Sequence, residues 1–282
     1  MKPLGTLSVD APAKINLGLR ILSRRSDGYH EIETGLVLID WCDRITVGLA
    51  DSVSITCSDR RLPTNGDNLC VRVAVEIKRE FNVSSGIHFH LEKQIPFGAG
   101  LGGGSSDAAA AIKLLSEIWS LNLSETEQYD VAKRIGSDVP FFLRGTPSIG
   151  RGRGEKLTAL ELPSVLSSLW VGVVDPGIVV STAQAYSEVT ARNSTAPSLE
   201  GIISQDDIGK WKSDLINDFE ISVFESYPAL ASIKNRLYRD GGIFASLTGS
   251  GSAIFSLFET KQGVVKAMKN TGLRSWVGRF RL

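Results

Sequence analysis

The stretch Pro96-Phe-Gly-Ala-Gly-Leu-Gly-Gly-Gly-Ser-Ser106 decides the fold, because five glycines there join a strand pattern to a helix pattern. Residues 86–95 alternate like a strand, and apolar residues at helical spacing over 107–119 predict a helix. The serines and the aspartate at 105–107 are residue types that cap helices. Glycine lets a ligand approach the backbone, and a helix N-terminus attracts anions. The stretch therefore predicts a phosphate cradle, rather than a turn that only packs a strand against a helix.

Two common phosphate-binding motifs do not fit this stretch. A P-loop needs a lysine directly after its glycines, and none follows here. Gly98, Gly100 and Gly103 spell G-x-G-x-x-G, but the dinucleotide fold also needs an acidic residue at the end of the next strand, about 20 residues on. The acidic residue at that spacing, Glu117, falls inside the predicted helix.

Composition bounds the kind of protein. A length of 282 residues suits two domains. Lys+Arg and Asp+Glu both number 31, so no nucleic-acid or basic membrane-binding surface is expected. Three cysteines without a C-x-x-C pair favour reduced thiols. No apolar run approaches the roughly 20 residues of a membrane span, and no signal-peptide pattern begins the chain. We expect a cytoplasmic protein, a monomer or a weak homodimer.

The N-terminal segment 7–22 alternates, with Lys14 and Asn16 on its polar face. The turn at 27–28 delivers Tyr29 and His30 to the start of the next strand. Strands are expected at about 31–39, 44–49, 53–57, 169–174 and 275–280, and a strand pair over 243–258. Helices are expected at 69–81, 124–134, 228–238 and 261–270, with a further helix capped by 181–182. Residues 145–155 are expected to form a connection or a strand edge, and the polar stretch 192–207 a mobile excursion.

Three of these segments resemble the motifs of the GHMP kinases: Ala11-Pro-Ala-Lys-Ile-Asn-Leu17, the glycine stretch, and the strand, glycine turn and strand of residues 243–258. That superfamily holds the phosphates of ATP in a P-x-x-x-G-L-G-S/G-S-S type loop. The resemblance implies an α+β fold of two domains. Residues 1–156 would form a ribosomal-protein-S5-like ATP-binding domain, and residues 157–282 a ferredoxin-like substrate-binding domain. The order of predicted elements in the second half also suits a ferredoxin-like layer.

The string Arg25-Ser-Asp-Gly-Tyr-His30 resembles one branch of these kinases. That branch uses ATP and Mg²⁺ to phosphorylate the 2-hydroxyl of a CDP-linked substrate, 4-diphosphocytidyl-2-C-methyl-D-erythritol, in the non-mevalonate isoprenoid route. In it the tyrosine and histidine hold the cytosine ring, which offers a face for stacking and polar edges. A homoserine or mevalonate kinase, which would not need Tyr29 and His30, is one alternative. A non-catalytic ATP-binding sensor is another, and the presence of Lys14 and Asp138 disfavours it.

The resemblance also implies roles for single residues. Asp138, in Gly136-Ser-Asp-Val-Pro140, would orient and deprotonate the acceptor hydroxyl, while Lys14 would stabilise charge and keep Asp138 ionised. We expect Tyr29 and Tyr186 to enclose the cytosine. ATP would contact Pro96, Phe97, Gly98, Ala99, Gly100, Leu101, Gly102, Gly103, Gly104, Ser105 and Ser106. Substrate would contact Asn16, Tyr29, His30, Thr182, Tyr186, Gly249 and Ser250. No metal centre made of protein side chains is predicted, and the magnesium ligands stay open among Ser105, Ser106 and water.

Overall fold

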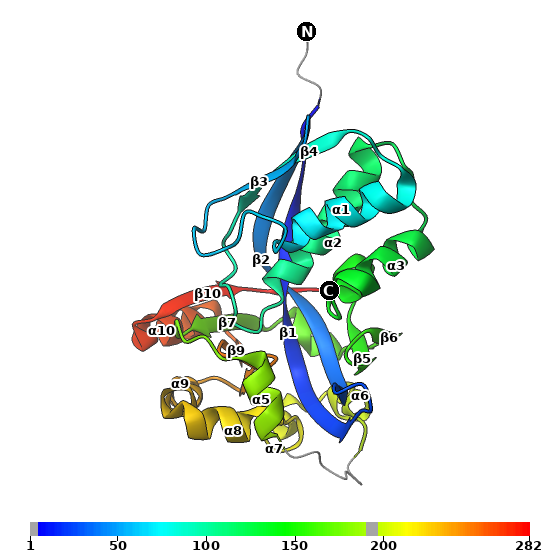
Figure 1. Ribbon diagram of the computed structural model, residues 1–282. Helices are drawn as coiled ribbons and strands as arrows, with labels where there is room; N and C mark the ends of the chain where they lie inside the picture. Colours follow the sequence, from blue (N-terminus) through cyan, green and yellow to red (C-terminus); the bar gives the residue numbers. More distant parts are fainter. Residues whose placement is uncertain (1–4, 190–196) are drawn as a thin grey trace. The chain divides into compact units, whose positions relative to one another are not determined.

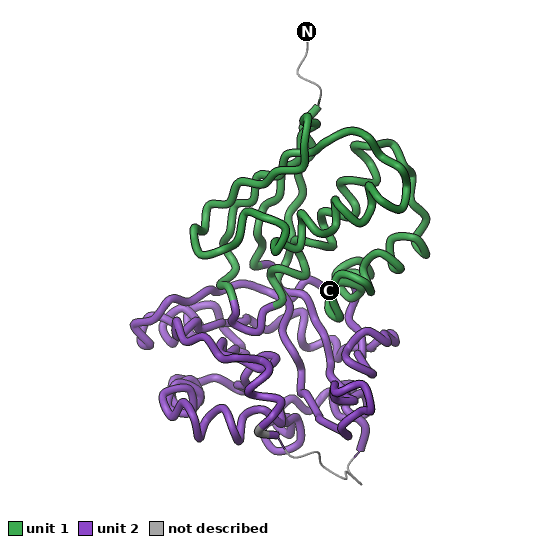
Figure 2. The backbone as a smooth tube through the Cα atoms, viewed as in Figure 1, with its two compact units in different colours: residues 1–13, 41–97, 102–145 green, residues 14–40, 98–101, 146–282 purple. Residues whose placement is uncertain are grey.

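The computed structural model describes residues 5–189 and 197–282 (Figure 1). Their packing divides the chain into two compact units (Figure 2). Unit 1 comprises residues 1–13, 41–97 and 102–145, and unit 2 comprises residues 14–40, 98–101 and 146–282. Several segments therefore alternate between the units, and the glycine stretch contributes to both. The predicted domain boundary near residue 156 stays a prediction.

Unit 1 combines part of a sheet with four helices. Strand β3 runs parallel to β4, and β4 pairs antiparallel with the second half of β2, Arg44 opposite Glu92. Helices α1 and α2 pack against each other, and α4 packs against α2 and α3. The elements are β2 (His30–Ala50), β3 (Val53–Cys57), β4 (Gly86–Glu92), α1 (Leu69–Phe81), α2 (Gly103–Ile118), α3 (Glu125–Ile135) and α4 (Val139–Arg144). Strand β1 (Leu7–Arg24), like β2, contributes to both units.

Several local predictions for unit 1 are confirmed. Helix α1 covers the predicted range 69–81, with Asn68 as its cap. The capping box that begins α3 is present, with Glu127 N donating to Ser124 Oγ at 3.3 Å and Ser124 N donating to Glu127 Oε2 at 2.8 Å. Helix α2 begins earlier than predicted, at Gly103.

Two predictions in this unit are wrong. The expected strands 31–39 and 44–49 are one strand, β2, because the polar residues between them do not turn the chain. Asp43 is fully buried there and accepts hydrogen bonds from two backbone N–H groups, so its polarity is satisfied inside the fold. The caps expected at 105–107 lie inside α2, whose N-cap is Gly102 in the left-handed region, at φ 72°.

Unit 2 contains a four-stranded antiparallel sheet in the order β10-β7-β9-β8. In chain order this is 4-1-3-2, the arrangement of a ferredoxin-like layer, as predicted. The strands are β7 (Trp170–Asp175), β8 (Phe244–Leu247), β9 (Ile254–Phe258) and β10 (Arg274–Gly278). The helices are η1 (Ser164–Ser167), α5 (Thr182–Glu188), α6 (Leu199–Ile203), η2 (Ile208–Lys210), α7 (Trp211–Asp214), α8 (Phe219–Ser226), α9 (Pro228–Arg239) and α10 (Lys261–Thr271).

Helices α9 and α10 pack against this sheet. Their apolar side chains Leu237, Val264 and Met268 join one core with Leu247 and Ile254 of the strands. Burying an aliphatic side chain of this size contributes roughly 1.5–3 kcal/mol, so this layer holds unit 2 together.

The first half of β2 pairs with β5 (Ser148–Gly152) and with β11 (Phe280–Arg281), and β5 pairs with β6 (Lys156–Ala159). Strand β5 therefore lies between two strands instead of forming a connection or an edge.

The stretch 192–207 was predicted to be a mobile excursion. Residues 190–196 lie outside the described part, but α6 follows them, and its Leu199 and Ile203 are fully buried. For 197–207 the prediction is wrong, because a few well-placed apolar residues anchor an otherwise polar segment. Among the described helices, none has the length and apolar character needed to cross a bilayer.

Candidate active site

Lys14 is buried on β1, with 4% of its surface exposed. Its Nζ donates to the carbonyl oxygen of Gly100 at 2.8 Å and to Asn16 Oδ1. Asn16 in turn donates from Nδ2 to Thr34 Oγ1 at 2.9 Å. The lysine expected on a polar strand face is thus an ammonium held in place against the glycine stretch, within unit 2.

The C-terminal glycine motif meets the same group. Thr248 Oγ1 accepts a hydrogen bond from Asn16 N at 3.1 Å. It lies 3.1 Å from Asn16 Oδ1 and 3.2 Å from Gly100 O, either of which can accept its hydrogen. At Gly249 an added Cβ would come 3.4 Å from Lys14 Nζ and 3.3 Å from Gly100 O. All three motifs found in the sequence therefore meet around Lys14.

Gly100 cannot carry a side chain at this meeting point. Its φ is +78°, and an added Cβ would lie 2.0 Å from the carbonyl oxygen of Thr248. The neighbouring carbonyl groups are also engaged, since Ala99 O accepts from Ala253 N at 3.1 Å and Leu101 O accepts from Lys14 N at 3.0 Å. Residues 99–101 are consequently tied to unit 2 through all three of their carbonyl oxygens.

The second half of the glycine stretch opens α2 in unit 1. At Gly103 an added Cβ would come 3.1 Å from the Ile95 side chain and 3.2 Å from Lys93 Nζ, so this glycine is needed for packing. Gly104 is exposed, and an added Cβ would meet only a Leu69 methyl group at 3.8 Å. The start of α2 therefore leaves space at Gly104, where the first N–H groups of a helix lack intrahelical partners.

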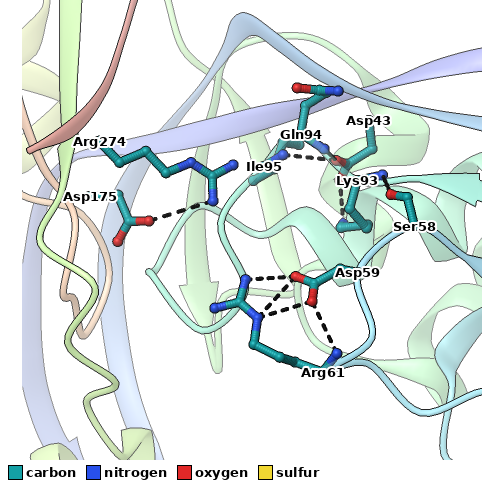
Figure 3. A network of polar contacts seen from close by, with 9 residues as sticks. All are labelled: Asp43, Ser58, Asp59, Arg61, Lys93, Gln94, Ile95, Asp175 and Arg274. Carbon is teal, nitrogen blue, oxygen red and sulfur yellow. Dashed lines mark hydrogen bonds and ion pairs between the residues drawn. The ribbon is translucent and has the colours of Figure 1, made fainter.

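A buried ion triad lies beneath this helix start. The Lys93 ammonium contacts Asp43 Oδ2 and lies 2.7 Å from Asp107 Oδ2. Asp43 Oδ1 also accepts from Gln94 N at 2.6 Å and from Ile95 N at 2.8 Å (Figure 3). One lysine thus connects the chain that enters the glycine stretch to the helix that leaves it.

The Asp107 carboxyl is almost wholly buried, and this burial raises its pKa. Burial is the larger cause, Lys93 opposes it and Asp43 adds to it, and the pKa of Asp107 is about 7. The pKa of Lys93 lies above its ordinary value, since the attraction of Asp107 and Asp43 outweighs the effect of burial. Within the described residues, Asp107 Oδ1 and Ser106 Oγ are buried without hydrogen-bond partners.

The predicted base-binding residues begin β2 and lie on α5, in unit 2. The rings of His30 and Tyr186 stack, with centroids 5.0 Å apart and planes 19° apart, and Tyr186 also packs edge-on against Phe219 at 4.8 Å. Tyr29 is 55% exposed. Without ligand, Tyr186 therefore faces His30, and its pairing with Tyr29 around a cytosine stays a prediction. Burial, with the charge of Arg24 adding, lowers the pKa of His30, so its ring is neutral at pH 7.

Thr182 connects this aromatic group to the glycine motif. Its hydroxyl lies 3.1 Å from Ser250 Oγ. It opens α5, which Ser181 caps by accepting from Gln184 N at 3.3 Å. Tyr186 follows Thr182 by one helical turn and so lies on the same face. The Thr182–Ser250 contact and the Tyr186–His30 stack thus connect α5 to the glycine turn and to the start of β2.

Asp138 lies in unit 1, where it immediately precedes α4. Its side chain makes no capping hydrogen bond to the start of that helix. Pro140 near the helix start fixes the local backbone. In the described ranges, no cluster of three or more His, Cys, Asp or Glu side chains could hold a metal ion.

Comparison with known proteins places this geometry in a family. The model described as GHMP kinases N terminal domain matches residues 68–146, and the one described as GHMP kinases C terminal matches residues 201–272. The 4-diphosphocytidyl-2-C-methyl-D-erythritol kinase of Salinibacter ruber is 41% identical over 277 residues, which are 95% of this chain and 97% of that protein. The chain belongs to the 4-diphosphocytidyl-2-C-methyl-D-erythritol kinase family of GHMP kinases.

The fold of this chain is also similar to solved structures of GHMP kinases. A crystal structure of a 4-(cytidine 5'-diphospho)-2C-methyl-D-erythritol kinase superposes with a TM-score of 0.82 at 32% identity, covering 97% of this chain and 99% of the other. The mevalonate kinase of Methanococcus jannaschii has a TM-score of 0.75, covering 99% of each chain, but at 16% identity it shows the fold alone. The predicted α+β GHMP kinase fold is confirmed.

Some residues of this kinase site were missed by sequence reasoning. Thr248 directly precedes the glycines of the third motif, so its position was a usable signal. Asn217 had none, although its Nδ2 donates to Leu247 O and Gly249 O, both at 2.9 Å, and so supports the glycine turn. Asp43 and Asp107 also gave no signal, because nothing in their local sequence indicates that they share a buried lysine.

Proposed function

We propose that this chain transfers the γ-phosphoryl group of ATP to the 2-hydroxyl of 4-diphosphocytidyl-2-C-methyl-D-erythritol. The product is the 2-phosphate, an intermediate of the non-mevalonate route to isoprenoid precursors, and we expect the reaction in the cytoplasm. The observation that carries the proposal is the buried Lys14 ammonium, held between the glycine stretch and the C-terminal glycine turn. Catalysis of phosphoryl transfer depends largely on positioning and on stabilising the charge of the transferred group, which a fixed ammonium can do.

ATP binding is assigned to the glycine stretch, residues 96–106. Phosphoryl transfer needs mainly positioning and stabilisation of the charge on the transferred group. The exposed start of α2 around Gly104 supports this assignment, because its N–H groups and its helix dipole both suit an anion. ATP binding would then lie in the predicted domain 1–156, whereas the proposed substrate residues come from both sides of residue 156.

Lys14 and Asp138 are proposed as the catalytic pair. Asp138 would accept the proton of the acceptor hydroxyl, and the hydroxyl oxygen would then attack the γ-phosphorus as ADP leaves. Lys14 would stabilise the negative charge that this step develops. The free capping position of Asp138 supports its role, since a carboxylate bound to its own helix would have to break that bond to accept a proton.

Mg²⁺ is proposed to accompany ATP. It usually keeps several waters and binds through substrate phosphates with only one or two carboxylates. The lack of a cluster of three ligating side chains among the described residues fits such a metal, carried on the nucleotide. Ser105 at the start of α2 is a candidate second contact.

The CDP-linked substrate is proposed to bind along the wall formed by Asn16, Tyr29, His30, Thr182, Tyr186, Gly249 and Ser250. A neutral His30 fits a base edge, because a neutral imidazole offers one donor and one acceptor. For a base to enter between Tyr29 and Tyr186, the stack of Tyr186 on His30 would have to open or widen.

Initial rates of ADP release with three acceptors test the proposal. We expect turnover with the CDP-linked substrate, and values of kcat/KM lower by at least about a hundredfold with homoserine and mevalonate, because a site built for polar contacts rejects compounds that lack them. Equal turnover of homoserine or mevalonate would contradict the assignment.

A further inference from the structure

The hairpin between β5 and β6 brings Arg153 to the exposed tyrosine of the base-binding wall. The Cζ atom of its guanidinium lies 4.9 Å from the centroid of the Tyr29 ring. This is within the range of a cation–π interaction, and Arg also stacks on aromatic faces. Both residues belong to unit 2, so the contact is part of one compact body.

The backbone on both sides of Arg153 is fixed. Gly152 N donates to Glu31 Oε1 at 3.0 Å, and Arg153 N donates to Glu155 Oε2 at 2.6 Å. Gly152 has φ +74°, and an added Cβ there would come 2.8 Å from Glu155 Oε1. The turn therefore holds the backbone of Arg153 in one conformation. Folding has already ordered this backbone, so ligand binding need not order it.

Neighbouring arginines are more fully neutralised than Arg153. Arg25 pairs with Asp27 at 2.9 Å and with Glu31 at 2.8 Å, and Arg151 pairs with Glu33 at 3.0 Å. The Arg153 Nε atom is 4.0 Å from Glu155, at the limit of an ion pair, and its side chain is about a third exposed. Of these three arginines, Arg153 therefore has the longest ion-pair distance, and it is the one that contacts the Tyr29 ring.

We propose that Arg153 is a specificity-determining residue that binds the diphosphate of the substrate while its guanidinium stays against Tyr29. A guanidinium presents five N–H donors in a planar fork that matches phosphate oxygens, and its face can pack on an aromatic ring at the same time. Arg153 would thereby contact both the diphosphate of the substrate and Tyr29, the residue proposed to bind the base. The proposal rests on the proposed function, because it assumes that Tyr29 binds a nucleoside.

Calorimetric binding of CDP and of cytidine to the full chain tests this role. The variants are Arg153→Gln, Arg153→Lys and, as a control, Lys156→Gln, which removes one positive charge at an exposed position of the same hairpin. We expect Arg153→Gln to weaken CDP about ten- to a hundredfold, the range of charge-assisted hydrogen bonds. Cytidine affinity should change less than about threefold. Arg153→Lys should restore part of the CDP affinity, and the control should match the wild type.

Steady-state kinetics give a second measurement. Arg153→Gln should raise KM for the CDP-linked substrate and leave kcat and the KM for ATP unchanged. Equal loss of CDP and cytidine affinity would reduce Arg153 to a support for Tyr29 and overturn the proposal, as would unchanged CDP affinity. In both of those cases wild-type binding of CDP still upholds the proposed function. A wild-type chain that binds neither CDP nor cytidine contradicts the proposed function itself and the role of Arg153 with it.

Discussion

The two halves of the glycine stretch are held by different chemistry. In residues 99–101 the carbonyl oxygens accept hydrogen bonds from Lys14, Thr248 and backbone N–H groups of unit 2. In residues 102–107 the chain is held from below by the triad of Asp43, Lys93 and Asp107 and by contact with Ile95.

This difference leaves a division of labour along one loop. In the first half, the backbone carbonyl oxygens accept hydrogen bonds from other protein groups. One of these bonds holds the Lys14 ammonium in place. The second half starts α2, where the first intrahelical bond runs from Ser106 N to Gly102 O at 2.9 Å. The N–H groups of 103–105 precede that bond, and we propose that they bind the phosphates of ATP. The triad of buried charges holds this half of the loop in place, so the N–H groups of 103–105 are not needed to anchor it.

Removing the shared cation gives the largest expected effect on the second half. Lys93→Met leaves two buried carboxylates without their partner, and breaking a buried ion pair costs about 3–5 kcal/mol. We expect urea unfolding to show a loss of that order. Lys133→Met is the control, because its ion pair with Asp130 is half exposed and such pairs contribute less than about 1 kcal/mol. Equal free energies of unfolding for the two variants would contradict the role of the triad in stabilising this part of the loop.

Changes at Lys14, which the first half holds, and at its proposed partner Asp138 should act on chemistry instead. Lys14→Ala and Asp138→Ala should each lower kcat at least about a hundredfold, the range for electrostatic and general-base groups. The double variant should lose far less than the product of the two, since residues that act as a unit are not additive. Near-normal turnover by Asp138→Ala would exclude it as the base.

Alanine substitutions at two adjacent glycines distinguish a glycine that faces the proposed ATP site from one that packs inside the protein. Gly104→Ala fills exposed space, so it should raise the KM for ATP about tenfold while stability stays equal or rises by up to about 1 kcal/mol, because alanine favours helices. Gly103→Ala should lower stability, since its Cβ meets Ile95 and Lys93. Thermal unfolding and ATP kinetics measure both. A Gly104→Ala enzyme with unchanged KM would place the phosphates elsewhere.

A further prediction is a pH dependence of stability from Asp107. Its pKa is about 7 in the folded chain and near 3.8 when unfolded, so the folded state binds the extra proton between these values. Its contribution to stability is therefore present at low pH and lost as pH rises from about 4 to about 7. The stability of Asp107→Asn relative to the wild type should increase from pH 5 to pH 8. A constant difference across that range would contradict the raised pKa.

Sequence patterns predicted much of the fold for physical reasons. Helix α1 and the capping box of α3 follow from local rules, and the ferredoxin-like layer follows from the order of strands and helices. The resemblance of the first motif to the GHMP kinases also marked Lys14 as a residue of the active site. These signals are local or ordered along the chain, so no tertiary information was needed.

What escaped prediction depends on residues that are distant in sequence. Asp43 is about fifty residues from Lys93 and reads as a polar break in a strand, so a long β2 was predicted as two strands. The stack of Tyr186 on His30 and the contact of Arg153 with Tyr29 join segments separated by well over a hundred residues. No periodicity encodes such pairs.

Amide NMR of the glycines tests directly whether the phosphates of ATP bind at the start of α2. The ¹H–¹⁵N signals of Gly98, Gly100, Gly103 and Gly104 would be followed while a non-hydrolysable ATP analogue with Mg²⁺ is added to the wild-type chain. The account predicts large shifts at Gly103 and Gly104 and small ones at Gly98 and Gly100. Large shifts confined to Gly98 and Gly100, or none in the stretch, would contradict the assignment of the phosphates to the start of α2.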